Sequence, residues 1–148
     1  MAAQLWLLRH GEAEPHAFDD FHRDLTPRGE DQSRSAGRAL KALDVVFHSV
    51  YTSPRVRAKR TAELACESLG CQPIVHEPLS LGFDAADARE LLVPDERVLV
   101  VGHNPDFAQI VYDMTGGRID FKKGAVAGIR ERELIVFLRP RELERIAG

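Results

Sequence analysis

Arginine and histidine side chains follow short apolar runs at widely separated places in this chain. Arg9 and His10 come directly after the apolar residues 5–8, and His103 comes directly after the apolar stretch "RVLVVG". Arg57 lies one turn inside a helix predicted to begin with "SP". Arginine presents a planar fork of N–H donors that matches phosphate geometry, and a neutral imidazole is a competent nucleophile near pH 7. If the fold brings these side chains together, they predict a site for a phosphoryl group.

The predicted elements alternate between strands and helices. Runs rich in β-branched and aromatic residues indicate strands, and apolar positions at helical spacing indicate helices. We expect strands at residues 4–8, 45–52, 71–77, 97–102, 124–131 and 134–139, and helices at residues 26–43, 53–70, 84–93 and 104–117. Residues 140–148 fit either a short helix or a frayed tail. The alternation favours an α/β layer fold with a mostly parallel sheet, in one domain spanning residues 1–148.

Three predicted helices begin with a capping residue followed by proline, at residues 26–27, 53–54 and 104–105. The cap accepts a hydrogen bond from a free backbone N–H, and proline lacks the N–H that would have no partner there. The second and third of these starts follow strands directly. They are therefore expected at the carboxyl ends of the strands, where open α/β sheets bind ligands and where helix N-termini favour anions.

Composition excludes several classes of protein. The chain has 148 residues, 44% hydrophobic and 29% charged, with a net charge of −3, so it has no overall basic field for nucleic acid or an anionic membrane. We expect no signal peptide and no membrane span, because no stretch approaches the roughly 20 apolar residues that a span needs. Cys66 and Cys71 fit neither a redox motif nor a zinc site, so we expect reduced thiols in a cytoplasmic, monomeric protein.

Four motifs resemble those of the histidine phosphatase superfamily, which is phosphoglycerate-mutase-like. They are "LLRHGEAE" near the N-terminus, "LTPRG" at 25–29, "SPRVRAKRT" at 53–61 and "VGHNP" at 101–105. Within the superfamily, the short length and the stretches "VGHNPDF" and "GAVAGI" look most like the small bacterial phosphohistidine phosphatases of the SixA type. The resemblance implies a three-layer α/β/α fold with a mostly parallel central sheet.

The resemblance also implies roles for four residues. His10 would be the nucleophile that becomes phosphohistidine, while Arg9, Arg57 and His103 would hold the phosphoryl group. The spacing of the "SPRVRAKRT" motif selects Arg57 rather than the neighbouring basic residues as the phosphate-binding arginine. No metal and no cofactor is implied.

An acidic residue that protonates the leaving group is the part of the family pattern that is not clearly matched. Glu77 and Asp84 lie in the right region, but neither falls on a clean motif. The imidazole that leaves phosphohistidine can take its proton from solvent. The missing acid therefore favours a phosphohistidine protein as substrate. A small phosphomonoester such as a phosphosugar or nucleotide stays open as the substrate, as does a phosphate-binding module without catalysis. Mutase activity needs a closed site, and no lid segment is evident.

Other residues near these motifs have less specific interpretations. A solvated helix face is the interpretation for Arg55 and its basic neighbours at 59 and 60, and a solvated turn is favoured for Lys122 and Lys123. The two lysines could instead rim the pocket and attract a phosphorylated partner. Phe18, Phe21 and Phe83 are assigned to the core in preference to the pocket mouth, and the remaining histidines to the surface without a metal site.

Overall fold

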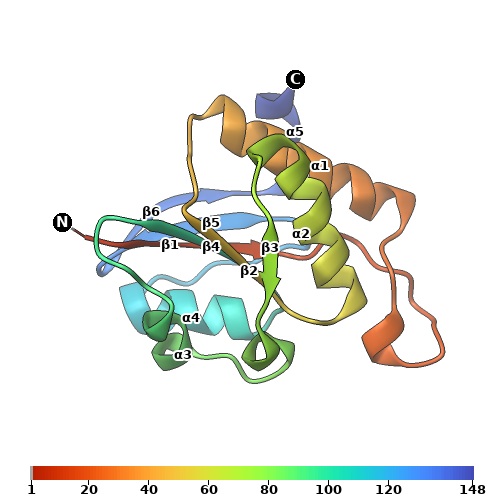
Figure 1. Ribbon diagram of the computed structural model, residues 1–148, viewed down its shortest axis with the longest axis horizontal. Coiled ribbons are helices and arrows are strands. Elements are labelled where there is room, and N and C mark those ends of the chain that lie inside the picture. The colour runs from red at the N-terminus through yellow and green to blue at the C-terminus, as the bar shows by residue number, and fades with distance from the viewer. Residues whose placement is uncertain (1) are drawn as a thin grey trace.

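The fold is built on a six-stranded sheet, seen in a computed structural model that describes residues 2–148. The strands lie in the order β3-β2-β4-β1-β5-β6 (Figure 1). They are β1 (Gln4–Arg9), β2 (Ser49–Thr52), β3 (Pro73–Val75), β4 (Arg97–Gly102), β5 (Val126–Arg130) and β6 (Glu133–Leu138). The first four run parallel, β5 is antiparallel to β1, and β6 forms a hairpin with β5. The mostly parallel sheet predicted from the sequence is confirmed.

Helices cover both faces of the sheet, which gives the predicted three layers. Figure 1 shows α1, α2 and α5 on one face and α3 and α4 on the other. The helices are α1 (Pro27–Ala42), α2 (Val56–Leu69), α3 (Ala85–Glu90), α4 (Asp106–Thr115) and α5 (Pro140–Ala147). Residues 140–148 thus form a helix for most of their length. None of the helices within residues 2–148 is long and apolar enough to cross a membrane.

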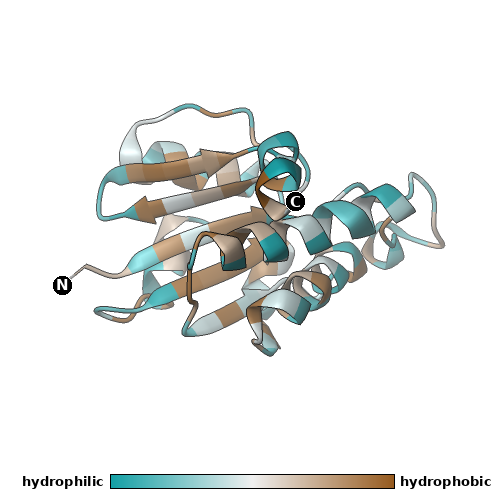
Figure 2. Ribbon diagram, turned by 90° about the horizontal axis from the view of Figure 1, so that it is seen from above, coloured by the Kyte–Doolittle hydropathy of each residue, from teal (hydrophilic) through white to brown (hydrophobic). Residues whose placement is uncertain are grey.

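The central strands are apolar on both faces because each face packs against helices. Alternate side chains of β1 point to opposite sides, so Leu7 packs with Phe107 of α4 while Leu8 packs with Ala36 of α1. Both leucines are fully buried. Figure 2 shows apolar strands at the centre and hydrophilic outer surfaces on the helices. This two-sided burial explains why β1 and β4 appear in the sequence as continuous apolar runs.

Two predicted helix starts are wrong, and the third is confirmed. α1 is capped by Thr26, whose hydroxyl accepts a hydrogen bond from the N–H of Gly29. α2 begins three residues later than Ser53, and α4 begins two residues later than Asn104. The side chains of Ser53 and Asn104 still accept hydrogen bonds from backbone N–H groups that follow them in the chain. Ser53 Oγ accepts from the N–H of Arg55, and Asn104 Oδ1 accepts from the N–H of Ala108. The turns between β2 and α2 and between β4 and α4 therefore contain residues, such as Ser53 and His103, that belong to neither the strand nor the helix.

Several predicted elements are shorter than expected. β2 begins at Ser49 because its pairing with β4 begins at the partner residue Val98. The β-branched residues that precede β2 do not continue the sheet, and Val46 among them is exposed. The edge strand β3 has three residues and the helix α3 has six. A β-branched run therefore indicated the right strands but not their ends, which depend on the neighbouring strand.

Candidate active site

The two predicted histidines meet where neighbouring parallel strands end. Arg9 at the end of β1 is in register with Gly102 at the end of β4, and the N–H of His10 donates to the carbonyl of Gly102 at 3.1 Å. This pairing brings the ring of His10 to the ring of His103, with 5.4 Å between their centroids. The sheet therefore places the two imidazoles side by side.

Arg57 joins the same cluster from the first turn of α2. Its side chain is almost completely buried, and its positive charge acts on both His10 and His103. The charge of Arg9 acts on the same two histidines. The structure thus brings together all four residues that the sequence selected for phosphoryl chemistry.

His10 is held as a neutral imidazole with one nitrogen engaged. Its Nδ1 lies 2.7 Å from the carbonyl oxygen of Gly11, and because a carbonyl can only accept, Nδ1 carries the proton. The pKa of His10 is lowered to about 3, mainly by burial and in smaller part by His103 and the two arginines, while the hydrogen bond to Gly11 raises it. The lone pair of a neutral imidazole with a protonated Nδ1 is on Nε2, the atom suited to nucleophilic attack.

His103 is also neutral and is anchored by a serine. Its Nε2 is hydrogen-bonded to Ser53 Oγ at 2.8 Å, and this hydroxyl also accepts from the N–H of Arg55. Burial, followed by the charge of Arg57, lowers the pKa of His103 to about 4. Ser53 was expected only as a helix cap, and its contact with His103 was missed because the two residues are 50 positions apart.

Two polar atoms of this cluster have no hydrogen-bond partner in the protein. Within residues 2–148 they are the only buried side-chain nitrogen or oxygen atoms of this kind: Arg9 Nε and His103 Nδ1. The other end of the Arg9 guanidinium is fixed, because Nη1 donates to the carbonyl of Phe121 at 2.7 Å. Buried polar atoms are nearly always paired, and an oxyanion at this position would supply acceptors.

A threonine at the end of the "SPRVRAKRT" motif ties the loop after His10 to α2. The Thr61 hydroxyl accepts from the N–H of Gly11 at 3.1 Å and donates to the carbonyl of Arg57 at 2.7 Å. A side chain at Gly11 would lie 2.5 Å from the carbonyl oxygen of Gly29, so glycine is required for this close approach. The motif was recognised in the sequence, but the role of Thr61 depends on contacts that only the fold reveals.

Asp20 contacts the candidate site and was not singled out from the sequence. Its carboxylate accepts from Nη2 of Arg57 at 3.1 Å, and its backbone carbonyl accepts from Nη1 of the same arginine at 2.8 Å. The carboxylate also pairs with Arg55 at 2.6 Å and with Arg23 at 2.9 Å. Desolvation opposes its ionisation, but the neighbouring arginines outweigh this effect and lower the pKa of Asp20 below its ordinary value. An internal carboxylate thus occupies one donor of Arg57, and a backbone carbonyl occupies a second.

The segment that carries Asp20 corrects two further expectations. It lies between β1 and α1 and projects beyond the sheet at the right of Figure 1. Phe18 is 99% exposed and Phe21 is 37% exposed, so neither belongs to the core, whereas Phe83 is buried there as expected. Arg55 does not lie on a solvated helix face, because it bridges Asp20 and the carbonyl of Ser80.

The two candidate proton donors lie on exposed parts of the segment between β3 and α3. Glu77 begins a short 3-10 helix and its side chain is exposed. Asp84 caps α3, where its carboxylate accepts from the N–H of Asp87 at 2.9 Å. Proton donation by either residue stays a prediction. In the described part of the chain, no three His, Cys, Asp or Glu side chains form a group that could hold a metal ion.

Comparison with known proteins identifies the family. Residues 5–80 match the profile of the histidine phosphatase superfamily (branch 1). An uncharacterized protein of Picosynechococcus sp. is 36% identical over 139 residues, which cover 86% of this chain and 84% of that protein. A 2,3-bisphosphoglycerate-dependent phosphoglycerate mutase of Methylobacterium radiotolerans is 39% identical over 83 residues, but these cover 52% of this chain and only 39% of the mutase.

A solved structure agrees over almost the whole fold. The protein histidine phosphatase SixA complexed with tungstate superposes with a TM-score of 0.82 and 27% sequence identity. The aligned region covers 95% of this chain and 99% of SixA. The sequence match, the likeness to a relative over most of both lengths and the shared fold agree, and the chain belongs to the histidine phosphatase superfamily.

Proposed function

We propose that this protein is a metal-independent phosphatase that works through a phosphohistidine on His10 and acts on phosphohistidine carried by a protein. Membership of the superfamily and the likeness to SixA support phosphatase activity in general. The observation that carries the mechanism is the buried, neutral His10 with Nδ1 hydrogen-bonded to Gly11, set among two arginines and a second histidine. We propose that residues 1–148 form a single domain and that it acts as a monomer.

The first half of the reaction transfers the phosphoryl group to the enzyme. Nε2 of His10 attacks the phosphorus atom, a P–N bond forms, and the bond from phosphorus to the leaving group breaks in line. The hydrogen bond from Nδ1 to Gly11 orients the ring and stabilises the positive charge that the imidazole gains. Because the pKa of His10 is lowered to about 3, its lone pair is available across the neutral pH range.

Positive charge around His10 stabilises the transferred group. A phosphoryl group in transfer spreads negative charge over three oxygens, and the arginines offer donors fixed in position. Arg9 Nε and His103 Nδ1 lack protein partners and can bind two of these oxygens. Arg57 contributes once the group displaces the carboxylate of Asp20 from its guanidinium.

The second half releases phosphate. A water molecule attacks the phosphorus of phosphohistidine, the P–N bond breaks, and His10 regains its lone pair as inorganic phosphate leaves.

The leaving group of the first half of the reaction must take up a proton. An imidazole leaving group can take it from solvent, whereas an alcohol needs a stronger acid. Glu77 and Asp84 are exposed carboxylates that we propose as donors for the second kind of substrate.

Hydrolysis assays in the presence of a chelator test the mechanism and the substrate class together. Wild type and His10→Ala would be given p-nitrophenyl phosphate and a protein phosphorylated on histidine. We expect turnover that resists the chelator and disappears in His10→Ala, with a higher kcat/KM for the phosphoprotein. A radiolabelled phosphoenzyme trapped during turnover should be labile to acid and stable to base, as expected for phosphohistidine.

His48→Ala is the matched control, because His48 is exposed and lies before β2, at the end of the strand away from Ser53. Activity that survives in His10→Ala would exclude His10 as the nucleophile. Efficient turnover of the small ester with the phosphoprotein untouched would assign the protein to small phosphomonoesters. Binding of vanadate without any turnover would identify a phosphate-binding module.

A further inference from the structure

A basic groove lies directly beside the phosphoryl site, on the side of β1 that faces α1 and α5. The groove has a volume of about 540 Å³. Six cationic side chains line it, against two carboxylates: the cations are Arg9, Arg28, Lys122, Lys123, Arg139 and Arg141, and the acids are Glu12 and Asp120. The chain as a whole carries a net charge of −3, so this concentration of positive charge is local.

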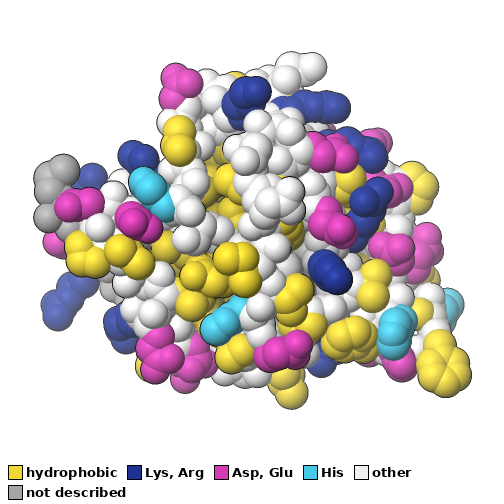
Figure 3. All heavy atoms as spheres, viewed as in Figure 1, with side chains coloured by type: hydrophobic (Ala, Val, Ile, Leu, Met, Phe, Trp, Pro, Cys, Tyr) yellow, Lys and Arg dark blue, Asp and Glu magenta, His cyan; other side chains and the backbone are white. Residues whose placement is uncertain are grey.

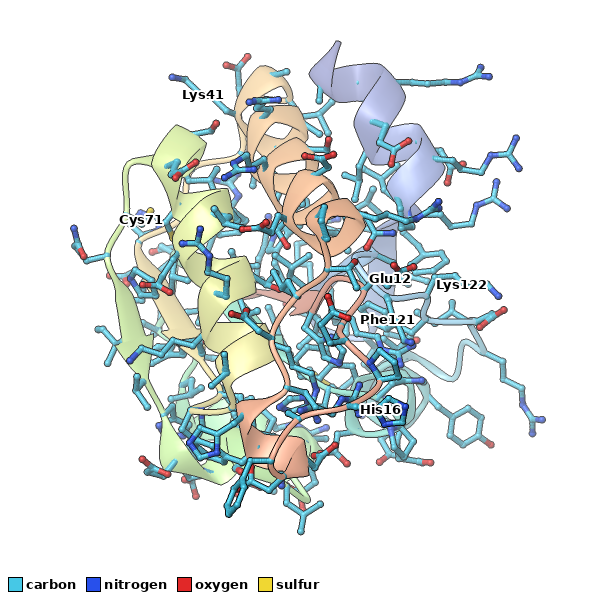
Figure 4. All side chains as sticks on the ribbon, turned by 90° about the vertical axis from the view of Figure 1, so that its right-hand side faces the viewer. Glu12, His16, Lys41, Cys71, Phe121 and Lys122 are labelled. Carbon is cyan, nitrogen blue, oxygen red and sulfur yellow. The ribbon has the colours of Figure 1, made fainter. Side chains whose placement is uncertain are left out.

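The groove adjoins the catalytic cluster through Arg9, which lines the groove and whose charge acts on His10. On one wall, the N–H of Gly124 donates to the carbonyls of Arg9 and His10 at 3.1 and 2.9 Å. On the other wall, the N–H of Glu12 donates to Gln32 Oε1 at 2.9 Å. Figure 4 shows Glu12, Phe121 and Lys122 near one another beside α5. A substrate whose phosphoryl group reaches His10 can therefore extend along this groove.

The cations are spread along the groove, and most are held weakly or through exposed pairs. Arg139 pairs with Glu142 through Nε and Nη2, both at 2.9 Å, and Arg141 pairs with the same carboxylate at 3.7 Å. Lys122 pairs with Asp120 at 2.9 Å, and Arg28 pairs with Glu12 at 3.8 Å, with both cationic side chains more than 60% exposed. Lys123 has no ion pair with the described part of the chain. Exposed pairs of this kind contribute about 0–1 kcal/mol each, so carboxylates from a partner can replace the internal ones at little cost. Dispersed exposed charges recognise an extended anion rather than a single compact one.

We infer that this groove binds an acidic segment of the protein whose phosphohistidine is the substrate, on the side chains of Lys122, Lys123, Arg139 and Arg141. The inference rests on the proposed function and deepens it by naming the chemistry of the partner. Carboxylates flanking the phosphohistidine lie against the groove while the phosphoryl group enters the site. The positive field also raises the rate of encounter with an acidic partner, an effect that salt reduces.

Two synthetic peptides provide the test. Both carry one histidine phosphorylated with phosphoramidate, flanked by glutamates in one peptide and by glutamines in the other. At low salt we expect wild type to show a kcat/KM at least about fivefold higher for the glutamate peptide, with the preference falling toward one at roughly 0.5 M salt. The double variant Lys123→Glu/Arg141→Glu should lose or reverse the preference, and Lys123→Arg/Arg141→Lys should keep it.

Lys41→Glu is the control for the change in charge, because Lys41 is exposed in the last turn of α1, far from Lys122 (Figure 4). It should show the wild-type preference. Equal kcat/KM for the two peptides in wild type would overturn the inference, and so would a preference that the double variant retains. Circular dichroism melting curves would establish that each variant is folded.

A binding measurement separates this inference from the proposed function. The unphosphorylated glutamate peptide, labelled with fluorescein, should bind wild type more tightly than the double variant, as measured by anisotropy. If neither phosphopeptide is hydrolysed but this difference is found, the groove inference stands and the proposed substrate class fails. If both phosphopeptides are hydrolysed equally and no difference in binding is found, the proposed function stands and the groove inference fails.

Discussion

Asp20 determines, at the scale of single residues, how the positive charge of the site is balanced. Its carboxylate takes one donor of Arg57 and also pairs with Arg55 and Arg23. The carboxylate is about half exposed, whereas the Arg57 side chain is almost buried. A phosphoryl group that binds Arg57 must therefore compete with an anion that belongs to the protein. We expect this competition to weaken the binding of oxyanions, and to weaken it more the more stable the ion pair between Asp20 and Arg57 is.

Asp20→Asn should strengthen oxyanion binding. The substitution removes the negative charge but keeps the backbone carbonyl that accepts from Arg57 Nη1. Loss of one partly exposed pair of about 1 kcal/mol corresponds to about fivefold tighter binding of vanadate. Isothermal titration calorimetry with vanadate at pH 7.5 would measure the change.

The neighbouring substitution Asp19→Asn is the control for Asp20→Asn. Asp19 caps the short 3-10 helix Asp20–His22, which carries Asp20, and the Asp19 carboxylate binds His22 rather than the catalytic cluster. It should leave vanadate affinity at the wild-type value. Weaker binding in Asp20→Asn would refute the competition and would show instead that the carboxylate holds Arg57 in its binding position.

The close packing of α1 against α2 sets the position of the phosphate site at the scale of elements. α2 carries Arg57 and Thr61, and α1 packs on α2 through Gly37, where an added side chain would collide with the carbonyl of Ala65. A helix interior ordinarily favours alanine over glycine by about 1 kcal/mol. Here the steric requirement of the helix pair outweighs that preference.

Gly37→Ala should therefore destabilise the protein in spite of the gain in helix propensity. Separating the two helices by enough to admit a methyl group disturbs packing that is fully buried, and overpacking of this kind costs about 1–3 kcal/mol. Urea unfolding followed by circular dichroism would measure the free energy of unfolding. Ser35→Ala, at a half-buried position of the same helix, should change it by less than about 0.5 kcal/mol. A Gly37→Ala variant as stable as wild type would mean that α1 and α2 can separate freely.

Elements also show how far the sequence could predict the site. The buried strands β1 and β4 were predicted because helices on both faces make them continuously apolar, and residues at their carboxyl ends must then share one edge. This reasoning was sufficient to bring Arg9, His10 and His103 together. Asp20 could not be found in the same way. It lies in an irregular segment without periodicity, and its contact with Arg57 spans 37 positions along the chain.

Charge is distributed unevenly at the scale of the whole molecule. The face in Figure 3 carries acidic and basic side chains interspersed with apolar ones. The arginines of the catalytic cluster and the basic groove instead concentrate positive charge around the carboxyl end of β1. Burial is the main reason that His10 and His103 are neutral, and the positive charges of Arg57 and Arg9 lower the pKa values of both histidines further.

Two buried neutral histidines couple the stability of the entire fold to pH. The pKa values of His10 and His103 are lowered to about 3 and about 4, from an ordinary value of 6.5. Below pH 6.5 the unfolded chain therefore takes up two protons that the folded chain does not. The stability associated with these histidines is fully present above pH 6.5 and is lost as pH falls toward their folded-state pKa values.

The free energy of unfolding should consequently fall between pH 7 and pH 5, by about 2 kcal/mol for each of the two histidines. Urea unfolding at a series of pH values would measure this slope. The variant His10→Gln/His103→Gln should have a shallower slope, because it retains only the contribution of carboxylates such as Asp20, whose pKa is lowered. His48→Gln removes an exposed histidine and controls for the loss of an imidazole as such. An unchanged slope in the double variant would mean that the buried histidines accept protons in the folded state. In that case the argument that His10 is a neutral nucleophile at mildly acidic pH would also fail.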